Sequence, residues 1–128
     1  MTTTLRTTDI DALLDDRSIP AADRALWSLL RDRAGRLADL LSLDVRDVDL
    51  EGRTITHDTV RKLNSDAQVE RFSPRTAELL RAVLADSDDA GPLFRRPGTD
   101  AALPTETAIR RTQRLAGCSI HAFRVAGA

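Results

Sequence analysis

The chain has 128 residues, and 41% of them are apolar, which is enough for one domain with a modest core and too much for a disordered chain. With 19 basic and 20 acidic residues its net charge is −1, which argues against a nucleic-acid binder that works through bulk positive charge. It has no run of 18 apolar residues and no N-terminal secretory signal, so we expect a cytoplasmic protein that spans no membrane.

The N-terminal part of the chain predicts three successive helices. Thr8 is a suitable N-cap for a first short helix over residues 9–16. A second helix opens at Pro20 and runs to about Arg33, because its apolar residues recur at the helical period. Gly35 breaks this pattern, and we expect a third short helix after it. Three leucines of this third helix should be buried: Leu37, Leu40 and Leu41.

The middle of the chain predicts a small antiparallel sheet. Residues 48–50 and 54–56 contain β-branched side chains and flank a Gly-containing turn at 51–52, which is typical of a hairpin. Residues 69–72 supply a third strand. The polar stretch between the second and third strands, residues 58–68, is expected to form a loop or a second hairpin tip.

Helices return in the C-terminal part. Ser73-Pro74 starts a helix with proline in its first turn, and residues 86–103 form a surface loop. A helix over residues 105–116 follows and ends at Gly117, a usual position for a left-handed residue. The remaining segment, 119–128, is a short helical element. The whole chain is therefore expected to form one domain that is mainly α-helical with a small antiparallel β-sheet, an α+β fold.

Four pieces of the chain follow one another in a specific order. The first is the segment 24–50, which contains a predicted helix, the turn Arg33-Ala34-Gly35-Arg36 and the stretch Val45–Leu50. The other three are the predicted sheet, the helix start at 73–76 and the His-x-x-Arg pair at 121–124. In this order the chain resembles the tyrosine recombinases, the phage integrase family, whose members have a T-G-L-R-like turn and a V-x-D-V-D-L strand. The resemblance covers residues 8–126. It implies the first part of a catalytic domain that cuts and rejoins DNA strands without a cofactor or a metal.

Four side chains stand where the family has catalytic residues: Arg36, Lys62, His121 and Arg124. The resemblance implies that the two arginines fork onto phosphate oxygens, whose charge grows in the transition state. It implies that the lysine acts as general acid at the leaving 5′ oxygen, and that the histidine donates a hydrogen bond to the phosphate or assists proton transfer. The 128 residues include no tyrosine, so the family's nucleophile is missing and no covalent phosphotyrosyl step can take place on this chain.

Each of these side chains also has a purely structural interpretation. Arg36 is spaced to pair with Asp39 on a helix surface, which would be a weak ion pair. Lys62 can be a solvated loop residue that is out of register with the family's lysine, and His121 can serve as a cap or a packing residue. His57, at the end of a strand, is interpreted as structural.

Two other functions stay open. Residues 22–43 form two predicted helices around Gly35 and are compatible with a helix-turn-helix transcription regulator, although the second helix is rich in leucine and short of base-reading side chains. The chain is also compatible with a fragment of a longer, active recombinase. The preferred interpretation is a DNA-binding, integrase-like domain that is incomplete as an enzyme. It contacts DNA phosphates weakly and uses no cofactor, metal or membrane.

Overall fold

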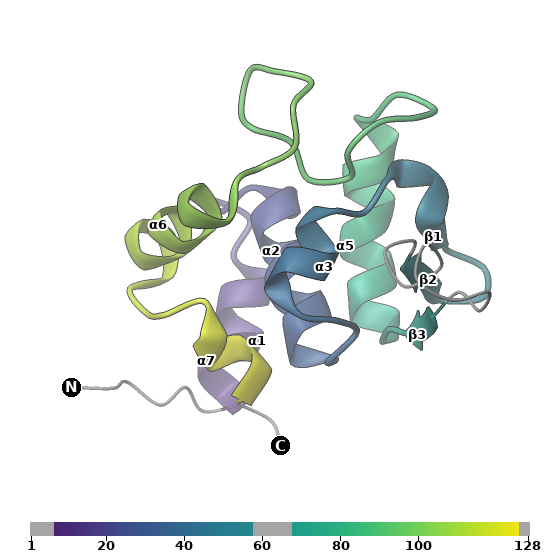
Figure 1. Cartoon of the computed structure of the whole chain (residues 1–128). Helices are drawn as coiled ribbons and strands as arrows, with labels where there is room; N and C mark the ends of the chain where they lie inside the picture. The colour runs from purple at the N-terminus through teal and green to yellow at the C-terminus, as the bar shows by residue number, and fades with distance from the viewer. Residues whose placement is uncertain (1–6, 58–67, 126–128) are drawn as a thin grey trace.

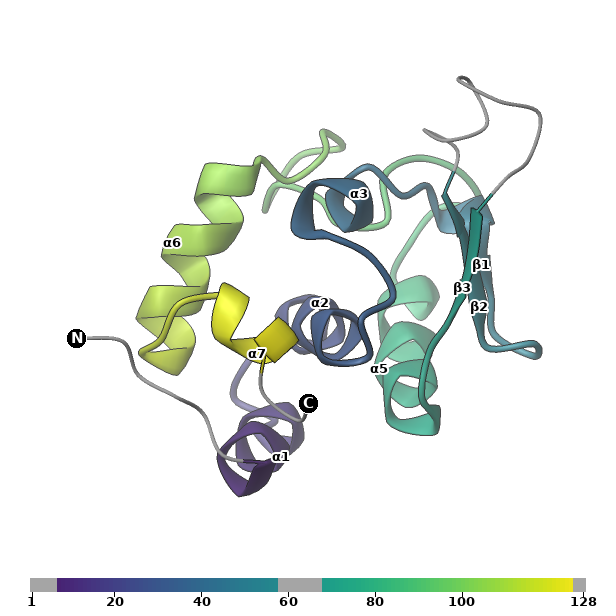
Figure 2. The ribbon, with the colours of Figure 1, turned by 60° about the horizontal axis from the view of Figure 1, so that its bottom comes forward.

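The computed structural model describes residues 7–57 and 68–125, and Figure 1 shows a mainly helical fold with a small sheet at one side. Helix α2 lies at its centre, and Figure 2 shows the other helices arranged around it. The helices have the following bounds: α1 (Thr7–Asp15), α2 (Ala21–Arg31), α3 (Leu37–Leu41), α5 (Pro74–Ala85), α6 (Thr105–Ala116) and α7 (His121–Val125).

Helix α2 forms the centre of the core because apolar side chains occupy most of its circumference. The helical period places Trp27 at the side of the apolar stripe, yet its indole is fully buried. It stacks on Phe123 of α7 with the ring centroids 4.9 Å apart. Its N–H donates a hydrogen bond to the hydroxyl of Thr112 on α6 at 3.0 Å, so the polar end of the ring is satisfied. These two contacts fix α6 and α7 on α2.

The predicted antiparallel sheet is confirmed. It consists of β1 (Val48–Asp49), β2 (Thr54–His57) and β3 (Gln68–Arg71), in the order β1-β2-β3. In its register Val48 pairs with Ile55, and Ile55 pairs with Glu70 on the other side. Burial alternates along β2, so that Ile55 and His57 both point into the protein. The central strand therefore brings a buried histidine to the helical core.

The chain enters β1 through a 3-10 helix, η1 (Val45–Asp47), which replaces part of the extended segment that the family resemblance implies. Asp44 caps this element. Its carboxylate accepts a hydrogen bond from the N–H of Arg46, and its own N–H donates to the carboxylate of Asp47. This reciprocal pair satisfies the N–H groups at the start of the turn and makes it more favourable than an extended chain.

Helix α2 ends two residues earlier than predicted, and no glycine ends it. Its last residue is Arg31, and Arg33 adopts the left-handed conformation with φ 59°. The N–H of Arg33 donates to the carbonyl of Leu30 at 3.0 Å. The N–H of Ala34 donates to the carbonyl of Leu29 at 3.1 Å, which completes the pair of hydrogen bonds that commonly ends a helix. Arginine takes a position that glycine usually occupies, at a cost of roughly 1 kcal/mol.

The other helices follow the prediction closely. α5 and α6 have the expected bounds, and Gly117 ends α6 with φ 71°. α1 begins at Thr7, so Thr8 lies inside the helix and is not its N-cap. α3 has five residues and buries its leucines, which leaves no polar face for reading DNA bases and counts against a helix-turn-helix. Among the helices that the structure describes, none combines the length and the apolar character that a membrane crossing requires.

Candidate functional site

Residues 32–36 connect α2 to α3, and we call this segment the arginine turn because it ends at the predicted phosphate-binding residue Arg36. Asp32 is the C-cap residue of α2, and Arg36 is the N-cap residue of α3. Neighbouring elements hold the turn at three successive residues. α5 contacts it at Asp32, α7 contacts it at Arg33, and β2 contacts it at Ala34.

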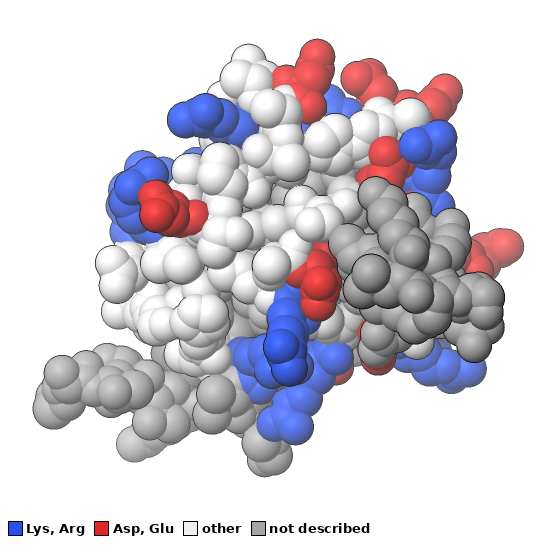
Figure 3. Space-filling model, viewed as in Figure 1, with Lys and Arg blue, Asp and Glu red and all other residues white. Residues whose placement is uncertain are grey.

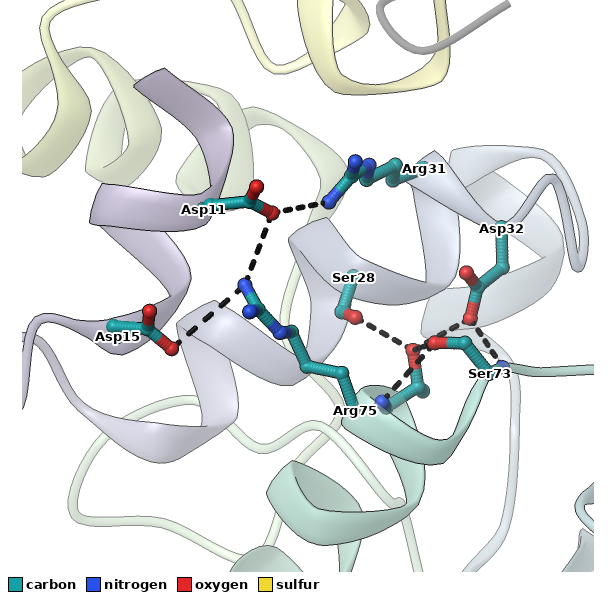
Figure 4. A network of polar contacts seen from close by, with 8 residues as sticks. Asp11, Asp15, Ser28, Arg31, Asp32, Ser73 and Arg75 are labelled. Carbon is teal, nitrogen blue, oxygen red and sulfur yellow. Dashed lines mark hydrogen bonds and ion pairs between the residues drawn. The ribbon is translucent and has the colours of Figure 1, made fainter. Parts of the chain in front are cut away.

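Asp32 ties the arginine turn to the N-terminus of α5 (Figure 4). Its Oδ2 accepts hydrogen bonds from the backbone N–H of Ser73 at 2.8 Å and from the hydroxyl of Thr76 at 2.5 Å. A carboxylate is favoured there because the first N–H groups of a helix lack partners within the helix and carry partial positive charge. Thr76 is fully buried. Because its one hydroxyl hydrogen goes to Asp32, it accepts a hydrogen bond from Ser28 at 2.5 Å.

A group of charged side chains next to this contact joins α1 to α2 and α5 (Figure 4). Asp11 of α1 accepts a hydrogen bond from Arg31 at 2.8 Å and another from Arg75 at 3.1 Å, and Arg75 also lies 3.7 Å from Asp15. These side chains are partly exposed, so each ion pair contributes at most about 1 kcal/mol. Their positive charges are neutralised within the fold, which sets these two arginines apart from the arginine turn.

His57 supports the arginine turn from the side of the sheet. It is 5% exposed, and its Nε2 lies 2.8 Å from the carbonyl oxygen of Ala34. Because a carbonyl can only accept, Nε2 carries the hydrogen and donates it. A Cβ atom on Gly35 would lie 2.9 Å from Cε1 and 3.0 Å from Nε2 of the same ring. The ring thus packs directly against the backbone of the turn, and glycine at position 35 provides the space.

Arg33 ties the arginine turn to α7. Its Nε–H donates to the carbonyl oxygen of Arg124 at 3.3 Å, across 91 positions of sequence. α2 and α7 pack against each other, and Figure 2 shows the end of α7 beside the end of α2. This contact places the last turn of α7, which carries Arg124, next to the segment that leads into Arg36.

The predicted site residues within the described ranges lie on the surface. Arg36 is exposed at the start of α3, while His121 and Arg124 are exposed in the first and last turns of α7. Lys62 lies outside the described residues. Figure 3 shows Lys and Arg side chains gathered in its lower centre, which in Figure 1 is the region below α3 and beside the end of α7. That the guanidinium groups of Arg36 and Arg124 grip one phosphate, with His121 beside them, stays a prediction.

Three exposed arginines have no acidic partner among the residues that the structure describes, and we call them the basic corner: Arg33, Arg36 and Arg124. None of them forms an ion pair with any acid in the described part of the chain, so the surface pair of Arg36 with Asp39 is not formed. Other arginines do pair with acids, among them Arg31, Arg75 and Arg111. Exposed arginines such as Arg81 and Arg110 form no ion pair within the described residues either, so the basic corner is defined by the contact of Arg33 with Arg124 and not by the missing acids alone. An arginine without an acid keeps its donors available for an external anion.

The sequence analysis identified Arg36 but not the residues that hold its turn. Asp32 and Ser73 are 41 positions apart, and no pattern in the sequence links a helix C-cap to the N-cap of a distant helix. Arg33 was missed because Gly35 carries the more common signal of a helix end. His57 was interpreted as structural, and its burial agrees with that interpretation, but its contact with the arginine turn has no signal in the sequence.

Comparison with known proteins gives matches among solved structures only, because no family model and no curated protein matches the chain. The crystal structure of XerA recombinase matches with a TM-score of 0.76 at 21% identity, over 97% of this chain and 47% of that chain. The Tn1549 transposon integrase, in two complexes with circular intermediate DNA, matches with TM-scores of 0.67 and 0.55. Its identity is 13% in both, over 98% and 97% of this chain and 51% of that chain.

These similarities confirm the predicted fold class. The chain is helical with a small three-stranded antiparallel sheet, and its fold is similar to that of part of the solved recombinase and integrase chains. It spans about half the length of the solved chains that it matches. At these levels of identity the comparison establishes the fold, and the chemistry has to be argued from the residues of the chain itself.

Proposed function

We propose that this chain is a DNA-binding, recombinase-like domain that holds a DNA phosphate between Arg36, His121 and Arg124, with Lys62 as the fourth member of the site. The observation that carries the proposal is the hydrogen bond from Arg33 to the carbonyl of Arg124, because it joins the arginine turn to the last turn of α7. The lack of acidic partners for the basic corner within the described residues, and the fold of the solved recombinases, support the same site.

A phosphodiester is the ligand that best suits these groups. Each guanidinium presents a planar set of donors that matches two phosphate oxygens, and it stays charged at every physiological pH. An exposed imidazole adds a further donor, and an ammonium can protonate a leaving oxygen. These contacts carry no base information, so the site binds DNA of any sequence. DNA as the partner also agrees with the proposed cytoplasmic location.

The proposal is binding without strand cleavage by the chain as given. Its 128 residues include no tyrosine, and a phosphotyrosyl intermediate needs one. Cys118 is no substitute, because it is buried and because burial raises the pKa of its thiol, which leaves little thiolate. If the chain is a piece of a longer recombinase, the same four residues serve the full enzyme and the nucleophile comes from elsewhere in that protein.

Charge removal at single arginines tests the proposal. We expect Arg36→Ala and Arg124→Ala each to weaken DNA binding by about tenfold, which corresponds to one charge-assisted contact of about 1.4 kcal/mol. The loss should be equal on two unrelated duplexes. The measurement is a titration followed by the anisotropy of a dye-labelled duplex at low salt.

The matched control is Arg81→Ala, which removes the same charge from an exposed position of α5. It should change the affinity by less than about twofold, because a distant surface charge acts only through screened long-range attraction. An equal loss in all three variants would mean that bulk charge, and no defined site, governs binding.

A further inference from the structure

We infer that His57 is a positioning residue for Arg36, because it fixes the stretch of backbone from which that guanidinium extends toward a DNA phosphate. The inference rests on the proposed function, since it assigns His57 a part in phosphate binding that acts through Arg36 alone. His57 itself is buried and does not touch the ligand.

The first support is the order of anchors along the arginine turn. Asp32 and Arg33 are fixed by α5 and α7, and the carbonyl of Arg36 accepts the N–H of Leu40 at 2.9 Å inside α3. Between these points lie Ala34 and Gly35, immediately before Arg36. It is at this stretch that the His57 side chain donates to the chain and packs against it.

The second support is the close fit at Gly35. The ring of His57 comes so near that a Cβ atom at this position would be 2.9 Å away, and Leu40 would lie 3.3 Å from it on the helical side. Such distances show that the ring lies next to the backbone at Gly35 and that a larger residue there would push against it. Because Gly35 directly precedes Arg36, a displacement of the ring changes the direction in which the arginine leaves the backbone.

The third support is the place of His57 in the sheet. It is the last residue of β2 and pairs with Gln68 of β3, so the sheet itself fixes its backbone. The chain continues from His57 toward Lys62, which lies outside the described residues. The strand that leads to the predicted general acid therefore also supports the predicted phosphate-binding arginine.

A purely structural histidine would give a different result from a positioning one. Loss of a buried hydrogen bond lowers the stability of the fold in any background, typically by about 1–3 kcal/mol. A positioning role adds a dependence on one partner, because removing His57 can weaken phosphate binding only while Arg36 is present. A double-mutant cycle isolates that dependence.

The experiment measures DNA binding by His57→Phe, Arg36→Ala and the double variant, using the anisotropy of a dye-labelled duplex of arbitrary sequence at several salt concentrations. Phenylalanine keeps a ring of similar size but donates no hydrogen bond. We expect His57→Phe to weaken binding by about tenfold. It should also make the salt dependence shallower by about 0.9 in the log–log slope, the value for one phosphate contact. In the Arg36→Ala background the same change should have less than about a twofold effect.

Two further variants keep the test decisive if His57→Phe folds poorly. His57→Gln retains an N–H donor near the position of Nε2 and should restore most of the binding. Gly35→Ala, made alone and together with Arg36→Ala, pushes on the ring from the opposite side and should weaken binding like His57→Phe. Thermal unfolding of each variant, followed by circular dichroism, confirms that the titrations are made on folded protein.

The outcomes separate the inference from the proposed function. If His57→Phe or Gly35→Ala weakens binding equally with and without Arg36, the positioning role is wrong while the phosphate site stands. If folded His57→Phe binds like the unchanged protein, the positioning role is also wrong. If Arg36→Ala itself has no effect, the proposed function fails and the inference fails with it. An effect confined to the background that contains Arg36, with rescue by glutamine, supports the inference.

Discussion

Arg33 occupies a backbone conformation that suits glycine, although it has a long charged side chain. Its φ of 59° lies in the left-handed region, where a Cβ atom meets the following carbonyl oxygen. Such strain persists where the surrounding structure holds the residue in place. Here the side chain is held by the carbonyl of Arg124, so the strained residue joins the two segments that carry the proposed phosphate ligands.

We predict that Arg33→Gly is more stable than Arg33→Ala by about 1 kcal/mol, because both lose the contact with Arg124 and only glycine relieves the left-handed strain. Urea unfolding of the two variants measures the difference. Both should bind DNA more weakly than the unchanged protein, since the arginine turn is no longer joined to α7. Equal stability of the two variants would show that Arg33 stores no strain.

Some of these residue roles could be predicted from the sequence, and others could not. Arg36 and Arg124 could be selected by their order and by residue type. The conformation of Arg33 could not, because arginine carries no preference for positive φ and Gly35 stood two residues further along. Gly35 was correctly seen as special, but for the wrong reason: it provides space for the ring of His57, which is a tertiary contact.

Asp44 links two elements that are far apart in the sequence, and its charge state governs that link. It caps η1 and also accepts a hydrogen bond from the N–H of Gly91 at 3.0 Å, in the loop between α5 and α6. The side chain and the backbone N–H of Arg46 donate hydrogen bonds to Asp44, as does the backbone N–H of Gly91, and together they lower the pKa of Asp44 to about 2. A carboxyl whose pKa falls on folding stabilises the native state only while it is ionised.

We predict that Asp44→Ala lowers the free energy of unfolding by about 1 kcal/mol near neutral pH, the usual effect of losing a capping carboxylate. The stabilisation is complete above the pKa of Asp44 in the unfolded chain, which is near 4. It is lost as the pH falls through the pKa of Asp44 in the folded protein, which is about 2. The difference between the two proteins should therefore shrink between pH 4 and pH 2. Urea unfolding across this range measures it. The control is Asp89→Ala, which removes an exposed carboxylate from the loop between α5 and α6 and should show no such dependence on pH.

Elements were predictable where their ends carry strong local signals. α6 has Pro104 before it and Gly117 after it, and its bounds agree with the prediction. η1 was not predicted because a capping box over three residues leaves the same sequence pattern as the start of a strand. Strong end signals thus made the longer helices predictable, while the short connection into β1 is held by a local capping box whose residue pattern does not distinguish a turn from a strand.

At the scale of the whole molecule, the distribution of charge matters more than its sum. The net charge is −1, yet the ion pairs found among the described residues all use arginines outside the basic corner, which itself has no acidic partner within that part of the chain. The proposed DNA binding would therefore rest on a small number of phosphate contacts, so it would be weak and would release few counterions.

We predict nonspecific DNA binding at or beyond the weak end of the usual range of about 10⁻⁴ to 10⁻⁶ M at physiological salt. The log–log dependence on salt should have a slope of roughly −2 to −3, which corresponds to two or three neutralised phosphates. Titration of two unrelated duplexes at a series of salt concentrations measures both quantities. Nanomolar binding to one duplex only would favour a sequence-specific regulator.

We also predict that a suicide DNA substrate, which traps covalent recombinase intermediates, forms no adduct with this chain, because it has no tyrosine. Denaturing electrophoresis of the reaction detects an adduct as a shifted band. A tyrosine recombinase with its nucleophile, treated in parallel, provides the positive control. A shifted band with this chain would mean that another side chain acts as nucleophile.

The fold class was accessible from the sequence, whereas the assembly of the site was not. Helical and strand periodicities are local, and they were sufficient to predict helices around a small sheet. The meeting of the arginine turn with α7 depends on Arg33 and on the packing of Trp27 against Phe123, which join segments about 90 positions apart. Only the resemblance to a family suggested that those segments come together.

The stacking of Trp27 on Phe123 has a practical consequence. The chain has one tryptophan and no tyrosine, so its intrinsic fluorescence comes almost entirely from a single indole in the contact between α2 and α7. Phe123 directly precedes Arg124, so a movement of α7 changes the surroundings of that indole. Separation of the two rings would admit water and shift the emission to longer wavelength. The fluorescence of Trp27 on α2 therefore reports the position of α7, the helix that carries Arg124, and this helix can be followed without an added label.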